Sequence, residues 1–142
     1  MSNKIIEVGH GKVKKVKIGG DLPLAFIGGP CAIENRDHAL FMAESIKKIC
    51  SELEIPWIYK SCYDKDCRSS PKSFHGVGID EGLRILSEVR DKFGVPVISD
   101  FSEPSDKTLY IFPDISFTNR SPFGKNAIPQ GIIYPSENNC TL

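Results

Sequence analysis

The sequence lacks the features that would place it in several large classes of protein. No apolar run approaches the roughly 20 residues that a membrane helix needs, and the amino end, residues 1–7, is too polar and acidic for a signal peptide. Neither sign of charge is in excess, because 18 Lys and Arg balance 18 Asp and Glu. Bulk attraction to nucleic acid or to an anionic membrane is therefore not indicated.

Cysteine is present, but not in the spacing of a disulfide scaffold. The five cysteines are an odd number scattered over the chain. We therefore expect free thiols or single metal ligands in a reducing compartment, with the cytoplasm as the location. The length of 142 residues is enough for one domain with a real core.

Strand-like segments recur through the first two thirds of the chain. Residues 4–18 alternate apolar and polar side chains around a glycine-rich turn, which predicts a β-hairpin. Continuous apolar runs at 24–27, 55–59 and 95–99 are typical of strands buried on both faces, as in a parallel sheet.

Two helical patterns separate these runs. Residues 37–53 repeat apolar side chains at three and four residue steps, and Asn35 or Asp37 can cap this helix. We expect Asp80 to cap a second helix that Gly94 closes in the left-handed conformation. Strand, helix, strand, helix, strand with short links predicts an α/β fold with right-handed parallel crossovers.

The stretch after the second of these strands is rich in cations and hydroxyls. Lys60, Lys65 and Arg68 supply three positive charges beside Ser69 and Ser70. An arginine fork with hydroxyls and backbone amides suits phosphate oxygens, and parallel sheets keep ligand groups at the carboxyl ends of their strands. We interpret this stretch as a site for a small phosphorylated substrate, and a solvated basic loop is the alternative.

The periodic pattern stops after residue 106. Residues 107–142 hold four prolines, each of which costs about 3 kcal/mol inside a helix. We expect this segment to be an irregular tail, and its abrupt change in composition suggests out-of-frame translation or a truncated gene.

Together, several short motifs resemble those of one enzyme family. The chain is similar, over about residues 4–106, to 3-deoxy-D-manno-octulosonate 8-phosphate synthase, also called 2-dehydro-3-deoxyphosphooctonate aldolase. The motifs are Gly28-Gly-Pro-Cys-Ala-Ile-Glu34, Tyr59-Lys-Ser-Cys-Tyr-Asp-Lys65, Arg68-Ser-Ser70, Ser73-Phe-His-Gly-Val-Gly78 and Ser99-Asp-Phe-Ser-Glu-Pro104. The resemblance implies the first three βα units of a (β/α)8 TIM barrel, preceded by an amino-terminal hairpin over its bottom, and truncated, since a complete barrel needs about 250 residues. In the intact family it implies a homotetramer.

The resemblance also implies a reaction and roles for individual residues. Phosphoenolpyruvate and arabinose 5-phosphate condense, water attacks and inorganic phosphate leaves, a step in KDO and lipopolysaccharide biosynthesis. By position, Lys60 and Lys65 would hold phosphoenolpyruvate, and Arg68 with Ser69 the phosphate of the pentose. Cys31 matches the cysteine ligand of a divalent metal in the metal-dependent branch, and Asp100 an acidic catalytic residue near that metal and its water. Such cations and metals stabilise developing charge and activate water.

Three readings stay open at this point. The first is a synthase family member that is inactive as this fragment, with metal binding weak or absent because the partner ligands lie in strands the pattern does not show. The second is a non-catalytic remnant that binds phosphorylated metabolites weakly or associates with a complementary fragment. The third is a relative of 3-deoxy-7-phosphoheptulonate synthase, although that sister family more typically carries Lys-Pro-Arg-Thr-Ser where this chain has Lys65-Asp-Cys-Arg-Ser-Ser70.

Overall fold

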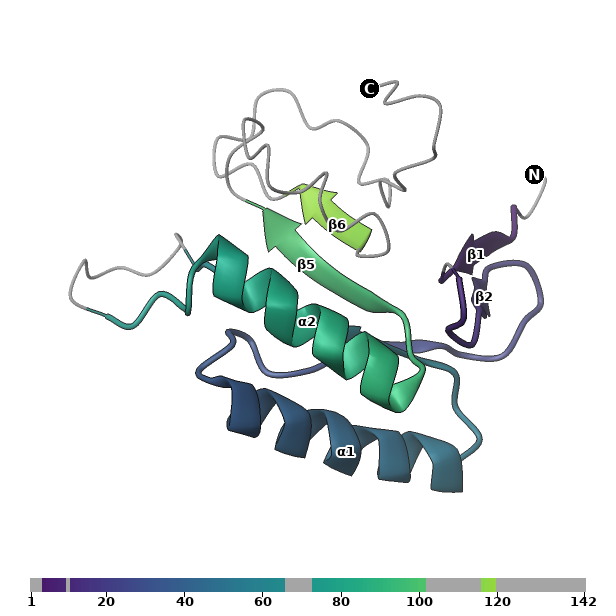
Figure 1. The fold of residues 1–142 in the computed structure, drawn as a ribbon. Helices are drawn as coiled ribbons and strands as arrows, with labels where there is room; N and C mark the ends of the chain where they lie inside the picture. Colours follow the sequence, from purple (N-terminus) through teal and green to yellow (C-terminus); the bar gives the residue numbers. More distant parts are fainter. Residues whose placement is uncertain (1–3, 10, 66–72, 102–115, 120–142) are drawn as a thin grey trace.

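The computed structural model describes residues 4–9, 11–65, 73–101 and 116–119 of the chain (Figure 1). In chain order its elements are β1 (Ile6–Val8), β2 (Val16–Ile18), β3 (Phe26–Gly28), α1 (Arg36–Glu52), β4 (Trp57–Lys60), α2 (Ile79–Phe93), β5 (Val97–Phe101) and β6 (Ser116–Asn119). Neither of the two helices in these residues combines the length and the apolar character that crossing a membrane requires.

The predicted amino-terminal hairpin is confirmed. β1 and β2 pair antiparallel, and their buried side chains Val8 and Val16 pack in one cluster with Ile58 of β4. The Lys14 amide donates a hydrogen bond of 3.0 Å to the carbonyl of Gly94, shortly before β5. The hairpin therefore covers one face of the sheet near the amino ends of its strands.

The main sheet is parallel, as the apolar runs predicted. Its strands follow the order β3-β4-β5-β6, and each neighbouring pair is parallel. Helix α1 connects β3 to β4 and α2 connects β4 to β5, so the chain makes two successive βαβ units. Both helices lie on the same side of the sheet (Figure 1).

The helix ends confirm two predicted caps and correct a third. Asn35 caps α1, because its side-chain oxygen accepts a hydrogen bond of 2.8 Å from the His38 amide. Gly94 ends α2 in the left-handed conformation, with φ 63°. The prediction that Asp80 caps α2 was wrong: Gly78 occupies the cap without a side-chain hydrogen bond, and Asp80 lies in the first turn. A carboxylate there still interacts favourably with the helix dipole.

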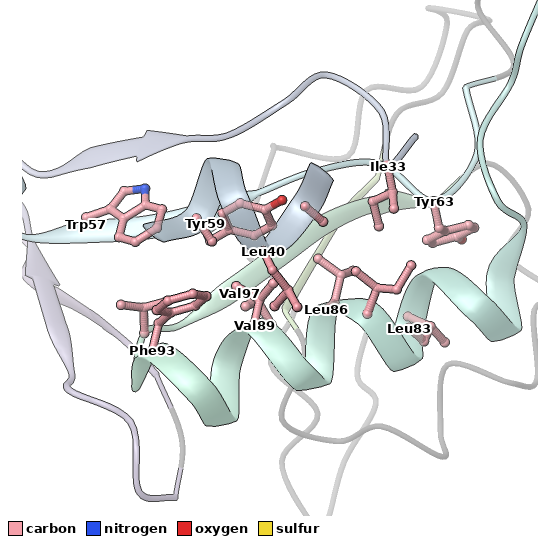
Figure 2. Close-up of a cluster of buried hydrophobic side chains, with 14 of the residues drawn as sticks. Ile33, Leu40, Trp57, Tyr59, Tyr63, Leu83, Leu86, Val89, Phe93 and Val97 are labelled. Carbon is pink, nitrogen blue, oxygen red and sulfur yellow. The ribbon is translucent and has the colours of Figure 1, made fainter. Parts of the chain in front are cut away.

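The core lies between the sheet and the two helices (Figure 2). Side chains from β4 and β5 meet side chains of both helices, because alternate strand residues point to the same face. The largest fully buried members are Tyr59, Ile33, Leu83, Ile85, Leu86, Val89 and Val97. Apolar burial on this scale is the main favourable contribution to folding.

The expectation that the strand at 24–27 is buried on both faces was wrong. Leu24 is 78% exposed, Phe26 43% and Ile27 44%. The reason is that β3 has a neighbour on one side only among the described strands. An apolar run indicates burial, but it does not say whether the covering element is present.

A second difference concerns the segment expected to be irregular. Ser116–Asn119 form β6, which pairs parallel with β5, Ile98 opposite Ser116. Four residues are too few to show a periodicity in the sequence, and the ladder of β5 supplies the hydrogen bonds that fix them. The remainder of 107–142 lies outside the described residues.

Candidate active site

The carboxyl ends of β3 and β4 are held side by side beyond the strands themselves. Ala32 and Cys62 continue the parallel pairing, and the Ile33 amide donates to the Cys62 carbonyl at 2.9 Å. The Ser61 hydroxyl, fully buried, donates to the Pro30 carbonyl at 2.7 Å. The segment after β3 is therefore fixed against the end of β4, where the basic stretch begins.

A glycine makes this close approach possible. A Cβ atom on Gly29 would lie 2.3 Å from the carbonyl oxygen of Lys60, a distance that no side chain tolerates. The sequence left open whether the glycines after the first strand allow a sharp turn or a close passage to a ligand. At Gly29 the close passage is to the backbone of β4.

Three polar side chains meet at this end of the sheet. The Lys60 ammonium donates to Asp100 Oδ2 at 2.9 Å and to Cys62 Sγ at 3.6 Å. The Cys62 thiol in turn donates to the same Asp100 oxygen at 3.2 Å. The three residues therefore form a closed triangle of contacts between β4, the residues directly after it, and β5.

Strand register explains why these three side chains meet. Lys60 lies opposite Ile98 in the parallel pairing. Cys62 and Asp100 each follow by two residues, so all of them belong to the face that the helices do not cover. Asp100 lies inside β5, one residue beyond the apolar run at 95–99, because the strand continues to Phe101.

The surroundings set the protonation of this triangle. Burial alone would lower the pKa of Lys60, but the hydrogen bond to Asp100 and the negative charge of that carboxylate raise it above its usual value. Burial raises the pKa of the Cys62 thiol, and the hydrogen bond to Asp100 raises it further. At neutral pH the pair is therefore an ammonium and a protonated thiol, which both donate to the carboxylate.

Two more of the predicted site residues lie together nearby. Cys31, exposed, follows β3, and its sulfur contacts the ammonium of Lys65. The Cys62 amide donates to the Cys31 carbonyl at 3.4 Å, which joins this pair to the triangle. The structure thus pairs Lys60 with Asp100 and Lys65 with Cys31 on neighbouring segments, while Arg68 and Ser69 lie outside the described residues.

The residues present do not make a complete metal site. A thiolate such as that of Cys31 is a good ligand for zinc and other soft metals. Within the described part of the chain, however, no three His, Cys, Asp or Glu side chains come together to hold an ion. Cys31 contributes one donor, and its sulfur contacts Lys65.

One member of the site was missed by sequence reasoning. Cys62 was not among the predicted site residues, and it is buried, at 1% exposure. Its sulfur also contacts both charged groups of the triangle. The signal was its position two residues after Lys60, which places both side chains on one face of the strand.

Fold and geometry together define a class: an α/β protein with a parallel sheet, helices on one face, and charged side chains gathered at the carboxyl ends of its strands, which is where (β/α) enzymes place their active sites. Comparison with known proteins narrows the class. The sequence pattern of the DAHP synthetase I family matches residues 4–111. The chain belongs to this family.

The individual relatives share one name. The chain is 52% identical over 97 residues to the 2-dehydro-3-deoxyphosphooctonate aldolase of Rickettsia rickettsii (strain Sheila Smith), covering 68% of this chain and 35% of that protein. The protein of the same name from Rickettsia prowazekii (strain Madrid E) is 50% identical over 94 residues, covering 66% and 34%. The chain therefore spans about a third of the length of these curated relatives, and the resemblance found in the sequence is confirmed.

Proposed function

We propose that this site serves the condensation of phosphoenolpyruvate with arabinose 5-phosphate to give 3-deoxy-D-manno-octulosonate 8-phosphate and inorganic phosphate. A carbon–carbon bond forms between the two substrates, water adds, and the phosphate of phosphoenolpyruvate leaves. The reaction is an aldol-type transfer in KDO and lipopolysaccharide biosynthesis. The name shared by the relatives supports this proposal.

The observation that carries the proposal is the placement of Lys60. Its ammonium lies at the carboxyl end of β4, is 31% exposed, and is fixed by the Asp100 carboxylate. An ammonium has three N–H groups, and two of them donate to Asp100 and Cys62. The third has no partner among the described residues, so it is available to an anionic substrate.

The remaining roles follow from the family match and are part of the proposal. Lys65 binds phosphoenolpyruvate together with Lys60, and Arg68 with Ser69 binds the phosphate of the pentose. Asp100 orients Lys60 and is the acidic catalytic residue near the metal and its water in the complete enzyme. In the complete enzyme, Cys31 would supply one ligand to a divalent metal, and we expect metal binding by this chain to be weak or absent.

The family match also leads to proposals about the setting. A cytoplasmic location and assembly as a homotetramer are expected for the complete enzyme. For the 142-residue chain itself, we expect no turnover, because the described strands β3 to β6 cannot close a barrel of eight strands.

Calorimetric titration of the chain with phosphoenolpyruvate tests the site. Lys60→Met keeps the length of the side chain and removes its charge, and a charge-assisted hydrogen bond contributes about 1.5–3 kcal/mol. We therefore expect phosphoenolpyruvate to bind about 10- to 100-fold more weakly. Lys48→Met, at an exposed position on α1, is the matched control and should bind as the wild type does. Equal affinities for all three proteins would refute the proposed site.

An activity assay separates the alternatives. The chain is incubated with phosphoenolpyruvate and arabinose 5-phosphate, with and without divalent metal, and phosphate release is followed. Turnover at the level of complete synthases would contradict the expected inactivity. Tighter binding of erythrose 4-phosphate than of arabinose 5-phosphate would favour the heptulosonate alternative. Failure to bind phosphoenolpyruvate and both sugar phosphates would contradict the synthase fragment and the remnant alike.

A further inference from the structure

Cys62 differs from the other buried thiol of the described chain in what its sulfur touches. Cys50, on α1, is 7% exposed and belongs to the apolar core between helices and sheet. Cys62 is 1% exposed, yet its sulfur contacts an ammonium and a carboxylate. A thiol that only fills space would not need two charged neighbours.

The geometry makes the thiol a bridge between these two charges. It accepts from Lys60 at 3.6 Å and donates to Asp100 Oδ2 at 3.2 Å, while Lys60 donates to the same oxygen at 2.9 Å. These three mutual contacts restrict the rotation of both charged side chains more than the salt bridge alone would. The backbone of Cys62 is fixed as well, by its bonds to Cys31 and Ile33.

We propose that Cys62 is a positioning residue, whose thiol holds the Asp100 carboxylate and the Lys60 ammonium in the one arrangement that directs the third N–H of Lys60 toward an anionic substrate. The inference rests on the proposed function for the identity of that anion. The three contacts themselves do not depend on it.

Three variants separate positioning from packing. Cys62→Ala removes the sulfur and its bridging contacts, and Cys62→Ser keeps a hydroxyl that can donate to Asp100 and accept from Lys60. Cys50→Ala removes the same atoms from a buried site without charged contacts, so it reproduces the packing defect alone.

The first measurement is direct and needs no substrate. Ammonium N–H signals of lysine are seen by nuclear magnetic resonance when hydrogen bonds slow their exchange with water, and Lys60→Met assigns the signal of Lys60. We expect that signal in the wild type, in Cys62→Ser and in Cys50→Ala, and its loss in Cys62→Ala. Its absence from the wild type, or its persistence unchanged in Cys62→Ala, would overturn the inference.

The second measurement is the dissociation constant for phosphoenolpyruvate in the same proteins. A hydrogen bond of ordinary strength corresponds to about a fivefold to tenfold change, so we expect that weakening in Cys62→Ala and less than about twofold in the other two. Equal weakening in Cys62→Ala and Cys50→Ala would reduce Cys62 to a packing role. A wild type that shows the Lys60 signal but binds no phosphoenolpyruvate would refute the proposed anion and leave the positioning intact.

Discussion

The two faces of the parallel sheet carry different kinds of side chain, and the four residues of β4 show the contrast. Trp57 and Tyr59 point into the core under the helices (Figure 2). Ile58 and Lys60 point to the opposite face, where Ile58 packs under the hairpin and Lys60 meets Asp100. At β4 and β5 one face is covered by the helices, and the other face is covered by apolar groups of the hairpin at its amino end.

The difference teaches where this fold can place charge. On the helix-covered face a lysine would lose its hydration without gaining a partner. The unfavourable free energy of burying such an unpaired charge is large. At the carboxyl end of the other face, neighbouring parallel strands bring Asp100 within 2.9 Å of Lys60, and the pair keeps some access to water. The helix-covered face therefore contributes apolar burial, and the carboxyl end of the other face holds the charged groups.

The largest expected effect comes from emptying the helix-covered core. Leu86 on α2 is fully buried there, and Leu86→Ala should lower the free energy of unfolding by about 3 kcal/mol through lost burial and a cavity. Urea denaturation followed by circular dichroism measures the change. The control is Leu53→Ala, at a position 62% exposed, which should change stability by less than about 0.5 kcal/mol. Similar losses for both variants would show that the helices do not enclose a packed core.

A pH experiment tests whether water is excluded from the helix-covered face. Burial raises the pKa of Tyr59 to about 12. Below pH 10 the phenol is protonated in both states, and between about pH 10 and 12 only the unfolded state releases its proton, so stability falls as the pH rises. The loss should be on the order of 2 kcal/mol over this range. Tyr59→Phe, compared with the wild type by urea denaturation at pH 9 and at pH 11.5, should lack this part of the loss.

The same slope in wild type and Tyr59→Phe would mean that water reaches the phenol. The two faces would then not differ as described, since water would reach the helix-covered face as readily as it reaches Lys60 and Asp100. A steeper fall of the unfolding free energy with pH in the wild type than in Tyr59→Phe would support the contrast between the two faces.

The parts of this contrast that depend on local sequence patterns could be predicted from the sequence. Helical spacing of apolar residues predicted both helices, and Asn35 and Gly94 predicted two of their ends. The placement of Lys60 at a strand end followed from the apolar run before it. These features depend on residues a few positions apart, which is the range that periodicity reports.

What could not be predicted depends on neighbours distant in the chain. The exposure of Leu24 on the segment leading into β3 reflects a missing covering element among the described residues, which no local pattern reveals. The contact of Cys62 with Asp100 requires the register between β4 and the strand after α2. Asp80 failed as a cap because Gly78, two residues earlier, already takes that position.

The smallest predicted effect concerns the packing of the hairpin on the face that the helices do not cover. It tests whether this packing is as tight as that of the helices on the opposite face. Ile98 in the hairpin-covered cluster and Ile85 in the helix-covered core are each 2% exposed. Removing one methyl group with Ile98→Val or Ile85→Val should cost about 1 kcal/mol at either site if both are packed to the density of a protein interior. Guanidinium denaturation of the two variants beside the wild type resolves such a difference. A cost near zero at Ile98 with the full cost at Ile85 would show that Val8 and Val16 pack only loosely on the sheet. On the face that the helices do not cover, the polar contacts at the carboxyl end would then be the better-defined ones.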